Sequence, residues 1–193
     1  MTEVLTEKRI LDTAEDVLRR YGPAKATVVD VARALGVSHG SVYRHFPSKV
    51  ALRDAVAERW LARITAPLAR LVEAPGPAAP RLEQLVKQLS AAKRRMSQDD
   101  PELFATFDQI VTQSRKVVSE HLDHLAAMLT AIIDDGVATG ELAAPDSAAA
   151  GRAVLHATAR FHHPAHVAEW ADPQIEADLD AVLSVLLHGL LRH

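Results

Sequence analysis

The sequence contains no cysteine among its 193 residues, which excludes a disulfide framework and metal sites built from thiolates. Aromatic residues make up only 4% of the chain, and runs of β-branched residues are few, so the signal for β-strands is weak. No stretch approaches the roughly 18 consecutive apolar residues that a transmembrane helix needs. The N-terminal residues mix acids with apolar side chains, unlike a secretory signal peptide. We therefore expect a soluble, cytoplasmic protein with no membrane partner.

Charge is unevenly distributed along the chain, although its net value is only −3. Residues 1–60 carry ten Lys/Arg against eight Asp/Glu, whereas residues 61–193 carry twelve against seventeen. Only the surface that docks on nucleic acid needs to meet phosphates, so a weakly basic segment can still bind DNA. The distribution is compatible with a modest DNA-binding domain joined to a sensor domain, but net charge alone does not decide the function.

Apolar residues recur with the 3.6-residue period of amphipathic helices along most of the chain. The pattern predicts an all-α fold with about nine helices and no sheet, with a bend at Pro67. The predicted helices cover about residues 6–22, 27–36, 38–46, 48–73, 81–97, a segment that begins at 101, 117–139, 147–162 and 174–191.

Helix boundaries are marked by capping residues at several points. Thr27 is followed three residues later by Asp30, which predicts a capping box, and Gly36 supplies the positive φ of a helix stop. Asp100 and Asp172 are each followed by proline, which predicts an N-cap and a proline in the first turn.

The most informative segment is residues 27–49, which read as two short capped helices joined at Gly36 and Val37. Apolar residues of the first helix can pack against Val42 and Phe46 of the second. Subtracting the apolar positions leaves an outward face of small polar groups and cations, formed by Ser38, His39, Gly40, Ser41, Arg44 and His45. In a helix-turn-helix, such a face of the second helix enters the major groove of DNA.

This segment resembles the DNA-binding domain of the tetracycline-repressor (TetR) family. The helix ILDTAEDVLRRYG, the T-x-x-D-V-A start, the L-G-V-S turn, the G-S-V-Y-R-H-F helix and the following P-S-K-x-x-L occur in the family's order and spacing. The match covers about residues 8–60. It implies an N-terminal three-helix helix-turn-helix domain at residues 1–50 and a C-terminal helical ligand-binding and dimerisation domain at residues 51–193.

The resemblance also implies roles for individual residues. Phosphate contacts correspond to Thr27, Tyr43, His45 and Lys49, base contacts to His39, Gly40 and Ser41, and Arg44 suits either role. Together with Ser38, the cap of the second helix, these nine residues are called the DNA-binding set. Simpler interpretations remain for three of them: Tyr43 as a core aromatic, His39 as a merely exposed residue and Lys49 as a solvated cation. Some family members carry a long polar residue two positions after the threonine, where this sequence has Val29.

Eight of the ten histidines lie beyond residue 120, and three explanations compete for them. His162 and His166 have the i, i+4 spacing of metal ligands, but Pro164 interrupts the helix that would align them. No G-x-S-x-G or comparable nucleophile motif is present, so we expect no enzyme, no cofactor and no metal. Most of these histidines then serve as helix ends or interface residues.

A pocket for a small hydrophobic effector is the third explanation. His121, Leu125 and Met128 share one helical face with Ile132, and only His121 offers a group that could orient a ligand. The alternative is that this stripe is ordinary core. The predicted ligand set is Met96, Phe104, Phe107, His121, Leu125, Met128 and Ile132.

Dimerisation is expected through the helices at about 147–162 and 174–191, which are rich in small and apolar residues. Two-fold symmetry would pair two helix-turn-helices on a near-palindromic double-stranded operator. The sequence therefore predicts a homodimeric DNA-binding repressor that a small molecule releases. A ligand-responsive activator, and a helical interaction or carrier protein that does not bind DNA, remain as alternatives.

Overall fold

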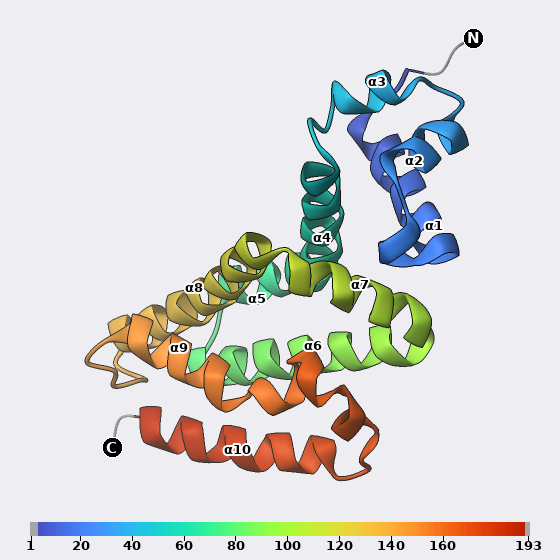
Figure 1. Cartoon of the computed structure of the whole chain (residues 1–193). Coiled ribbons are helices and arrows are strands. Elements are labelled where there is room, and N and C mark those ends of the chain that lie inside the picture. The colour runs from blue at the N-terminus through green and yellow to red at the C-terminus, as the bar shows by residue number, and fades with distance from the viewer. Residues whose placement is uncertain (1–3, 192–193) are drawn as a thin grey trace. The chain divides into compact units, whose positions relative to one another are not determined.

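The computed structural model describes residues 4–191, and their secondary structure is helical apart from one isolated bridge between Leu142 and Leu191 (Figure 1). The α-helices are α1 (Glu7–Lys25), α2 (Val28–Leu35), α3 (His39–Tyr43), α4 (Lys49–Thr65), α5 (Ala69–Glu73), α6 (Ala78–Asp99), α7 (Pro101–Gln113), α8 (Arg115–Thr139), α9 (Ser147–Ala157) and α10 (Ile175–Leu190). Short 3₁₀ turns cover Ala66–Leu68, Ala159–Phe161 and Pro164–Ala171. The all-α prediction is confirmed.

The chain divides into two compact units. The first takes its residues from Met1–Leu61 and Asp100–Ser119, and the second from Ala62–Asp99 and Glu120–His193. Helix α7 belongs to the same unit as the N-terminal helices, because it packs against α1. The functional boundary expected after residue 50 stays a prediction, since a compact unit and a functional domain need not coincide.

In the first unit, α1 supports the helices that follow it. Thr6 caps its start, and Gly22 interrupts it with a φ of 73°, so the last turn through Pro23 is kinked away from the rest. This kink falls where the sequence predicts the first helix to end, at about residue 22. Helices α2 and α7 both pack against α1, and its buried side chains include Ile10 and Val17.

The core of the first unit is completed by aromatic residues of α4 and α7. Asp100 caps α7 by accepting a hydrogen bond from the Leu103 amide at 2.9 Å, as the Asp-Pro pair predicts. The Trp60 ring stacks on Phe107 with centroids 5.2 Å apart, and meets Phe104 edge-on at 5.8 Å. The stacked rings hold α7 against the middle of α4.

The second unit is held by polar contacts that close its helix ends. The Glu141 carboxylate accepts hydrogen bonds from the Ala78 and Ala79 amides at 2.6 and 2.9 Å, which satisfies free N–H groups at the start of α6. Gly151 lets α9 cross α8 closely, because an added Cβ would lie 2.6 Å from the Thr130 hydroxyl oxygen. The Ser90 hydroxyl donates to the Phe161 carbonyl at 2.9 Å and links α6 to the turn after α9.

Several boundaries differ from the sequence-based expectation. The helix expected at 48–73 is interrupted at Pro67, as predicted: α4 ends at Thr65, and the chain continues as a 3₁₀ turn and α5 because Pro67 cannot donate a helical hydrogen bond. Asp172 does not act as the N-cap of α10; it accepts from the Gln174 amide at 2.8 Å, and α10 begins at Ile175. The helix expected to reach residue 162 ends at Ala157, where Thr158 turns its hydroxyl back to the Val154 carbonyl. Among the described residues, no helix combines the length and apolar character that crossing a membrane requires.

Candidate DNA-binding surface

Helices α2 and α3 are joined by a tight turn whose geometry depends on Gly36. This residue has φ 68° and ψ 28°, a left-handed conformation that costs energy for residues with a Cβ. Its amide and that of Val37 donate to carbonyls of the last turn of α2, at 3.1 Å to Arg33 and 3.0 Å to Ala32. The glycine stop predicted from the sequence is therefore confirmed, and it fixes the direction in which α3 leaves α2.

The start of α3 is ordered by a chain of side-chain contacts. The Ser38 hydroxyl accepts from the Ser41 amide at 3.2 Å, and the two hydroxyl oxygens lie 2.9 Å apart. Arg44 donates to the Ser41 hydroxyl at 3.2 Å. Val42 is fully buried and Phe46 is 8% exposed, so α3 is anchored by its apolar side. The Ser38–Ser41–Arg44 chain thereby faces away from the core.

Helix α3 is shorter than the sequence indicates. Only five residues are α-helical, after which hydrogen-bonded turns carry the chain through Phe46 to Pro47. The residue before a proline is disfavoured in the α conformation, which keeps the helix from continuing past Phe46. His39 and Tyr43, one turn apart, place their rings edge-to-face with centroids 6.3 Å apart. Tyr43 is 40% exposed, which does not fit a core aromatic.

Thr27 begins α2 with the capping box that the sequence predicts. Its hydroxyl donates to the Asp30 carboxylate at 2.6 Å and accepts from the Asp30 amide at 3.2 Å. The hydrogen bond from Thr27 is the main cause that lowers the pKa of Asp30, with the Arg33 charge adding to it. Thr27 is exposed, but its hydroxyl proton is held by Asp30, so contact with an external acceptor such as a phosphate oxygen requires the hydroxyl to turn from Asp30.

The remaining members of the set surround the α3–α4 turn. Ser48 caps α4 by accepting from the Ala51 amide at 3.0 Å, and exposed Lys49 follows in the first turn. His45 is part-buried. Seven of the nine residues of the DNA-binding set are exposed and two, Ser41 and His45, are part-buried; the exposed ones are Thr27, Ser38, His39, Gly40, Tyr43, Arg44 and Lys49. Contacts within the set join Ser38 to Ser41, Ser41 to Arg44 and His39 to Tyr43, all on or beside α3, while Thr27 begins α2 and Lys49 begins α4. A role of these residues in DNA binding stays a prediction.

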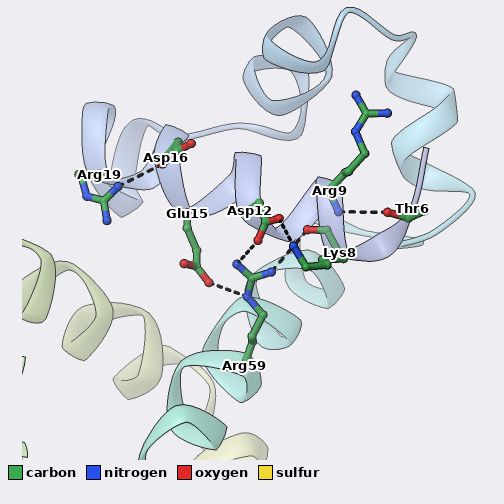
Figure 2. A network of polar contacts seen from close by, with 8 residues as sticks. All are labelled: Thr6, Lys8, Arg9, Asp12, Glu15, Asp16, Arg19 and Arg59. Carbon is green, nitrogen blue, oxygen red and sulfur yellow. Dashed lines mark hydrogen bonds and ion pairs between the residues drawn. The ribbon is translucent and has the colours of Figure 1, made fainter. Parts of the chain in front are cut away.

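Arg59 of α4 ties this surface to α1 through a polar network that sequence reasoning did not find (Figure 2). Its guanidinium lies 2.7 Å from Asp12 and 2.8 Å from Glu15, and both carboxylates come from α1. Burial lowers the pKa of Arg59, but the hydrogen bonds to Glu15 and Asp12 outweigh burial and raise it overall. The same contacts, after a hydrogen bond from Lys8, lower the pKa of Asp12. This network fixes α4, and with it Lys49, relative to α1.

A second cluster of polar side chains links α4 to the end of α7. Arg53 donates to the Gln113 side chain at 3.4 Å and to its carbonyl at 3.3 Å, at the end of α7. Asp54 accepts from Arg53 at 3.3 Å and from the Ser114 hydroxyl at 2.6 Å. The partners are 60 positions apart in the chain, so no local pattern could have revealed them.

The ligand set is divided between the two units. Phe104 and Phe107 belong to the first unit, where their contacts with Trp60 account for their burial. In the second unit, Met96 lines a cleft with Ile64 and Gln88, among other residues. Leu125, Met128 and Ile132 are buried on one side of α8. The ligand-binding role of the set stays a prediction. Only Met96, His121, Leu125, Met128 and Ile132 belong to the second unit and can line a pocket within it.

The histidines of the second unit lie in unusual surroundings. Burial, and after it the charge of Lys93, lowers the pKa of His121 to about 3. The same two causes lower the pKa of His162 to about 4, and its Nε2 lies 3.3 Å from the Thr158 hydroxyl. His166 pairs with Glu169 at 2.7 Å. Between residues 4 and 191, His, Asp and Glu side chains form no group of three or more placed to hold a metal ion.

An exposed polar face on a short helix, preceded by a capped helix and a left-handed glycine, defines a helix-turn-helix protein of the DNA-binding class. Comparison of the sequence with known protein families identifies its family. Residues 10–56 match the bacterial regulatory proteins of the tetR family, and residues 78–183 match the tetracyclin repressor-like C-terminal domain. The chain belongs to this family of bacterial regulators. Its members regulate transcription and are not enzymes.

Relatives and solved structures agree with this assignment. An uncharacterised HTH-type transcriptional regulator of Mycobacterium tuberculosis is 33% identical over 53% of this chain and 49% of its own. The HTH-type transcriptional repressor KstR of Mycolicibacterium smegmatis is 28% identical over 69% of this chain and 64% of its own. The chain spans about half the length of the first of these curated relatives. SmeT, the repressor of a Stenotrophomonas maltophilia multidrug efflux pump, shares the fold with a TM-score of 0.70 at 21% identity, covering 99% of this chain and 92% of its own.

Proposed function

We propose that the chain is a transcriptional repressor that binds a near-palindromic double-stranded DNA operator and is released from it by a small hydrophobic molecule. The observation that carries the DNA-binding part is the polar face of α3, ordered by the Ser38–Ser41–Arg44 chain and backed by buried Val42 and Phe46. A rigid, exposed face of this kind lets base edges be read without prior ordering of side chains.

The DNA-binding set divides by chemistry into two groups. Cations and hydroxyls around the turn into α4 suit phosphate oxygens, which position a protein on the duplex. Small groups at the start of α3 suit close approach to base edges, and Val29, 50% exposed on α2, offers only an apolar contact. In this proposal Thr27, Tyr43, His45 and Lys49 contact phosphates, His39, Gly40 and Ser41 contact bases, and Arg44 reaches either.

We place the functional domains at residues 1–50 for DNA binding and 51–193 for ligand binding and dimerisation. The dimer forms through α9 and α10, in the segments 147–162 and 174–191. Leu179 and Leu183 bury one side of α10, while the opposite side leaves Val185 73% exposed. An apolar residue so exposed on a terminal helix suits coverage by a second copy. Two subunits would then present two α3 helices to successive major grooves.

The effector site lies in the second unit in this proposal. Leu125, Met128 and Ile132 offer an apolar wall on α8, and His121 at its end carries a neutral imidazole that can donate or accept a hydrogen bond. A protein of the same fold has been solved with a ligand that carries a long acyl chain: FadR of Bacillus subtilis, in complex with stearoyl-CoA, has a TM-score of 0.66 to this chain at 18% identity, covering 95% of this chain and 99% of its own. A regulator of this kind works in the cytoplasm, where the chromosome lies.

Release requires that the effector bind the DNA-free state more tightly than the DNA-bound state. A ligand-responsive activator shares every feature above and differs only in where the operator lies relative to the promoter. A helical carrier protein that does not bind DNA is the other alternative, and it predicts no affinity for duplex DNA at low salt.

Selection of bound duplexes from a random pool tests the proposal directly. We expect one near-palindromic sequence to be enriched, and Ser41→Ala to shift the preferred bases at fixed positions of each half-site. Thr112→Ala, a hydroxyl loss on α7 outside the DNA-binding set, is the matched control and should leave the preferred sequence unchanged. Recovery of no preferred sequence by the wild-type protein would contradict the operator-binding role.

A further inference from the structure

The first unit contains a cavity of about 210 Å³ between α1, α2, α4 and α7. Aliphatic side chains form most of its wall, and six of them are branched residues no more than 6% exposed: Val17, Val28, Val31, Leu52, Val56 and Ile110. All of these residues belong to the first unit, so the cavity is separate from the effector site proposed on α8.

The size and lining of this cavity restrict what can occupy it. The cavity is partly open to solvent, because Val50 in its wall is 52% exposed and Lys49 is exposed as well. A sealed apolar cavity of about 150 Å³ takes up benzene, so a volume of this order accommodates an aromatic ring. The present cavity is larger, and a substituted benzene ring of about ten non-hydrogen atoms matches it. A strongly polar molecule would lose its hydrogen bonds to water without replacement.

Four polar residues line the cavity beside this aliphatic wall, and three of them already have partners. Arg53 is bound to Asp54 and Gln113, and the Thr27 hydroxyl is hydrogen-bonded to Asp30. Lys49 is exposed in the first turn of α4 and also lines the cavity. Its flexible ammonium group is therefore the group best placed to meet a charged end of an occupant, and that end must be negative.

We propose that this cavity binds a small aromatic carboxylic acid, with the ring among the aliphatic side chains and the carboxylate on the Lys49 ammonium. Thr27 and Lys49 also belong to the DNA-binding set, so an occupant would draw Lys49 away from DNA phosphates. Binding of the acid stands on the cavity alone, whereas this effect on DNA rests on the proposed function.

The test uses 4-methylbenzoate as the probe and the full chain, followed by NMR chemical shifts of the backbone amides. We expect saturable shifts confined to residues around the cavity, with a dissociation constant of about 0.1–1 mM, a usual affinity for a ligand of this size. Toluene, which lacks the charge, should bind at the same residues about tenfold more weakly. Acetate, which lacks the ring, should cause no saturable shift.

Two variants locate the site. Ala14 is 2% exposed and lines the cavity, so Ala14→Leu fills it and should abolish binding of both 4-methylbenzoate and toluene. Lys49→Gln should weaken 4-methylbenzoate about tenfold and leave toluene unchanged. Lys25→Gln removes an exposed charge of the same unit outside the cavity and is the matched control. Because Lys49 is exposed, its variant decides the outcome even if Ala14→Leu does not fold.

The proposal is overturned if acetate reproduces the shifts of 4-methylbenzoate, or if Lys25→Gln weakens binding as much as Lys49→Gln. Unaltered binding by folded Ala14→Leu would overturn it as well. Fluorescence anisotropy of a selected DNA duplex, with and without the probe, then tests the effect on DNA. A protein that binds the probe but no DNA refutes the proposed function alone, and one that binds DNA but not the probe refutes the cavity site alone.

Discussion

Burial of His162 makes the stability of the chain depend on pH in a way that can be calculated. Its side chain is 6% exposed, and removal from water together with the nearby Lys93 charge lowers its pKa from the usual 6.5 to about 4. The Leu155 carbonyl acts in the opposite direction but does not cancel these effects. The imidazole is therefore neutral in the folded protein over most of the acidic range.

The sign and size follow from proton linkage. Between the folded pKa of about 4 and the unfolded value of 6.5, the unfolded state binds more protons, so the free energy of unfolding falls as pH falls. At pH 5 this loss amounts to about 2 kcal/mol relative to pH 8, and it approaches about 3 kcal/mol at still lower pH. Above pH 6.5 the imidazole is mostly neutral in both the folded and the unfolded state, so it no longer lowers the free energy of unfolding.

Urea unfolding followed by circular dichroism, at one protein concentration and at pH 8 and pH 5, measures the effect. His162→Gln cannot take up a proton, and its amide can replace the contact of Nε2 with Thr158. We expect the variant to be less stable than wild type at pH 8 because packing is altered. Its loss of stability between pH 8 and pH 5 should nevertheless be smaller than that of wild type by about 2 kcal/mol.

The comparison isolates one residue because the other nine histidines are common to both proteins. His156→Gln, at an exposed position of α9, controls for the removal of an imidazole from the surface. Equal losses of stability in wild type and His162→Gln would refute the reasoning, since they would mean that folding does not hold this imidazole neutral.

Three further substitutions test the framework. Arg59→Leu removes the guanidinium from buried Glu15 and should cost about 1–3 kcal/mol in urea unfolding. Gly151→Val places a Cβ 2.6 Å from a side-chain oxygen of α8 and should cost about 1–3 kcal/mol in urea unfolding; unchanged stability would contradict the close crossing of α9 and α8. Gly36→Val forces a β-branched residue to a φ of 68° and should cost at least about 1 kcal/mol, with weaker DNA binding in a duplex titration; full retention of both would contradict the role of the turn.

The features predicted correctly from sequence depend on neighbours a few residues apart. The Thr27–Asp30 capping box and the Gly36 stop are contacts within one helical turn, so the residue types nearly determine them. Asp100 fulfils the same prediction, but Asp172 with the same following proline does not. The contrast between these two Asp-Pro pairs shows that the pair favours a turn, while packing with the rest of the chain decides whether a helix begins there.

The features that sequence reasoning missed depend on residues distant in the chain. Arg59 meets Glu15 across 44 positions, and Arg53 meets Gln113 across 60. A helical periodicity shows which side of α4 is buried but not which helix covers it. For the same reason the ligand set combined Phe107 with residues of α8, although Phe107 packs on Trp60 in the other unit.

The cavity of the first unit had no sequence signal of any kind. Its walls are aliphatic residues at helical spacing, which read as ordinary core in α1, α2 and α4. Whether such residues close completely on each other depends on how four helices pack, and a sequence does not reveal a shortfall of about 210 Å³.

The salt dependence of operator binding tests the central claim, that the surface around α3 binds DNA, most directly. Fluorescence anisotropy with a selected duplex should give a linear decrease of log K against log salt concentration. Only the cations of the set, Lys49 and Arg44, release counterions from phosphates, so we expect a slope of about −2 to −4 per dimer. Lys49→Gln should weaken binding to every sequence and make the slope less steep by about 2, because one phosphate contact is lost in each subunit. Absence of binding at low salt, or a slope that Lys49→Gln leaves unchanged, would contradict the assignment.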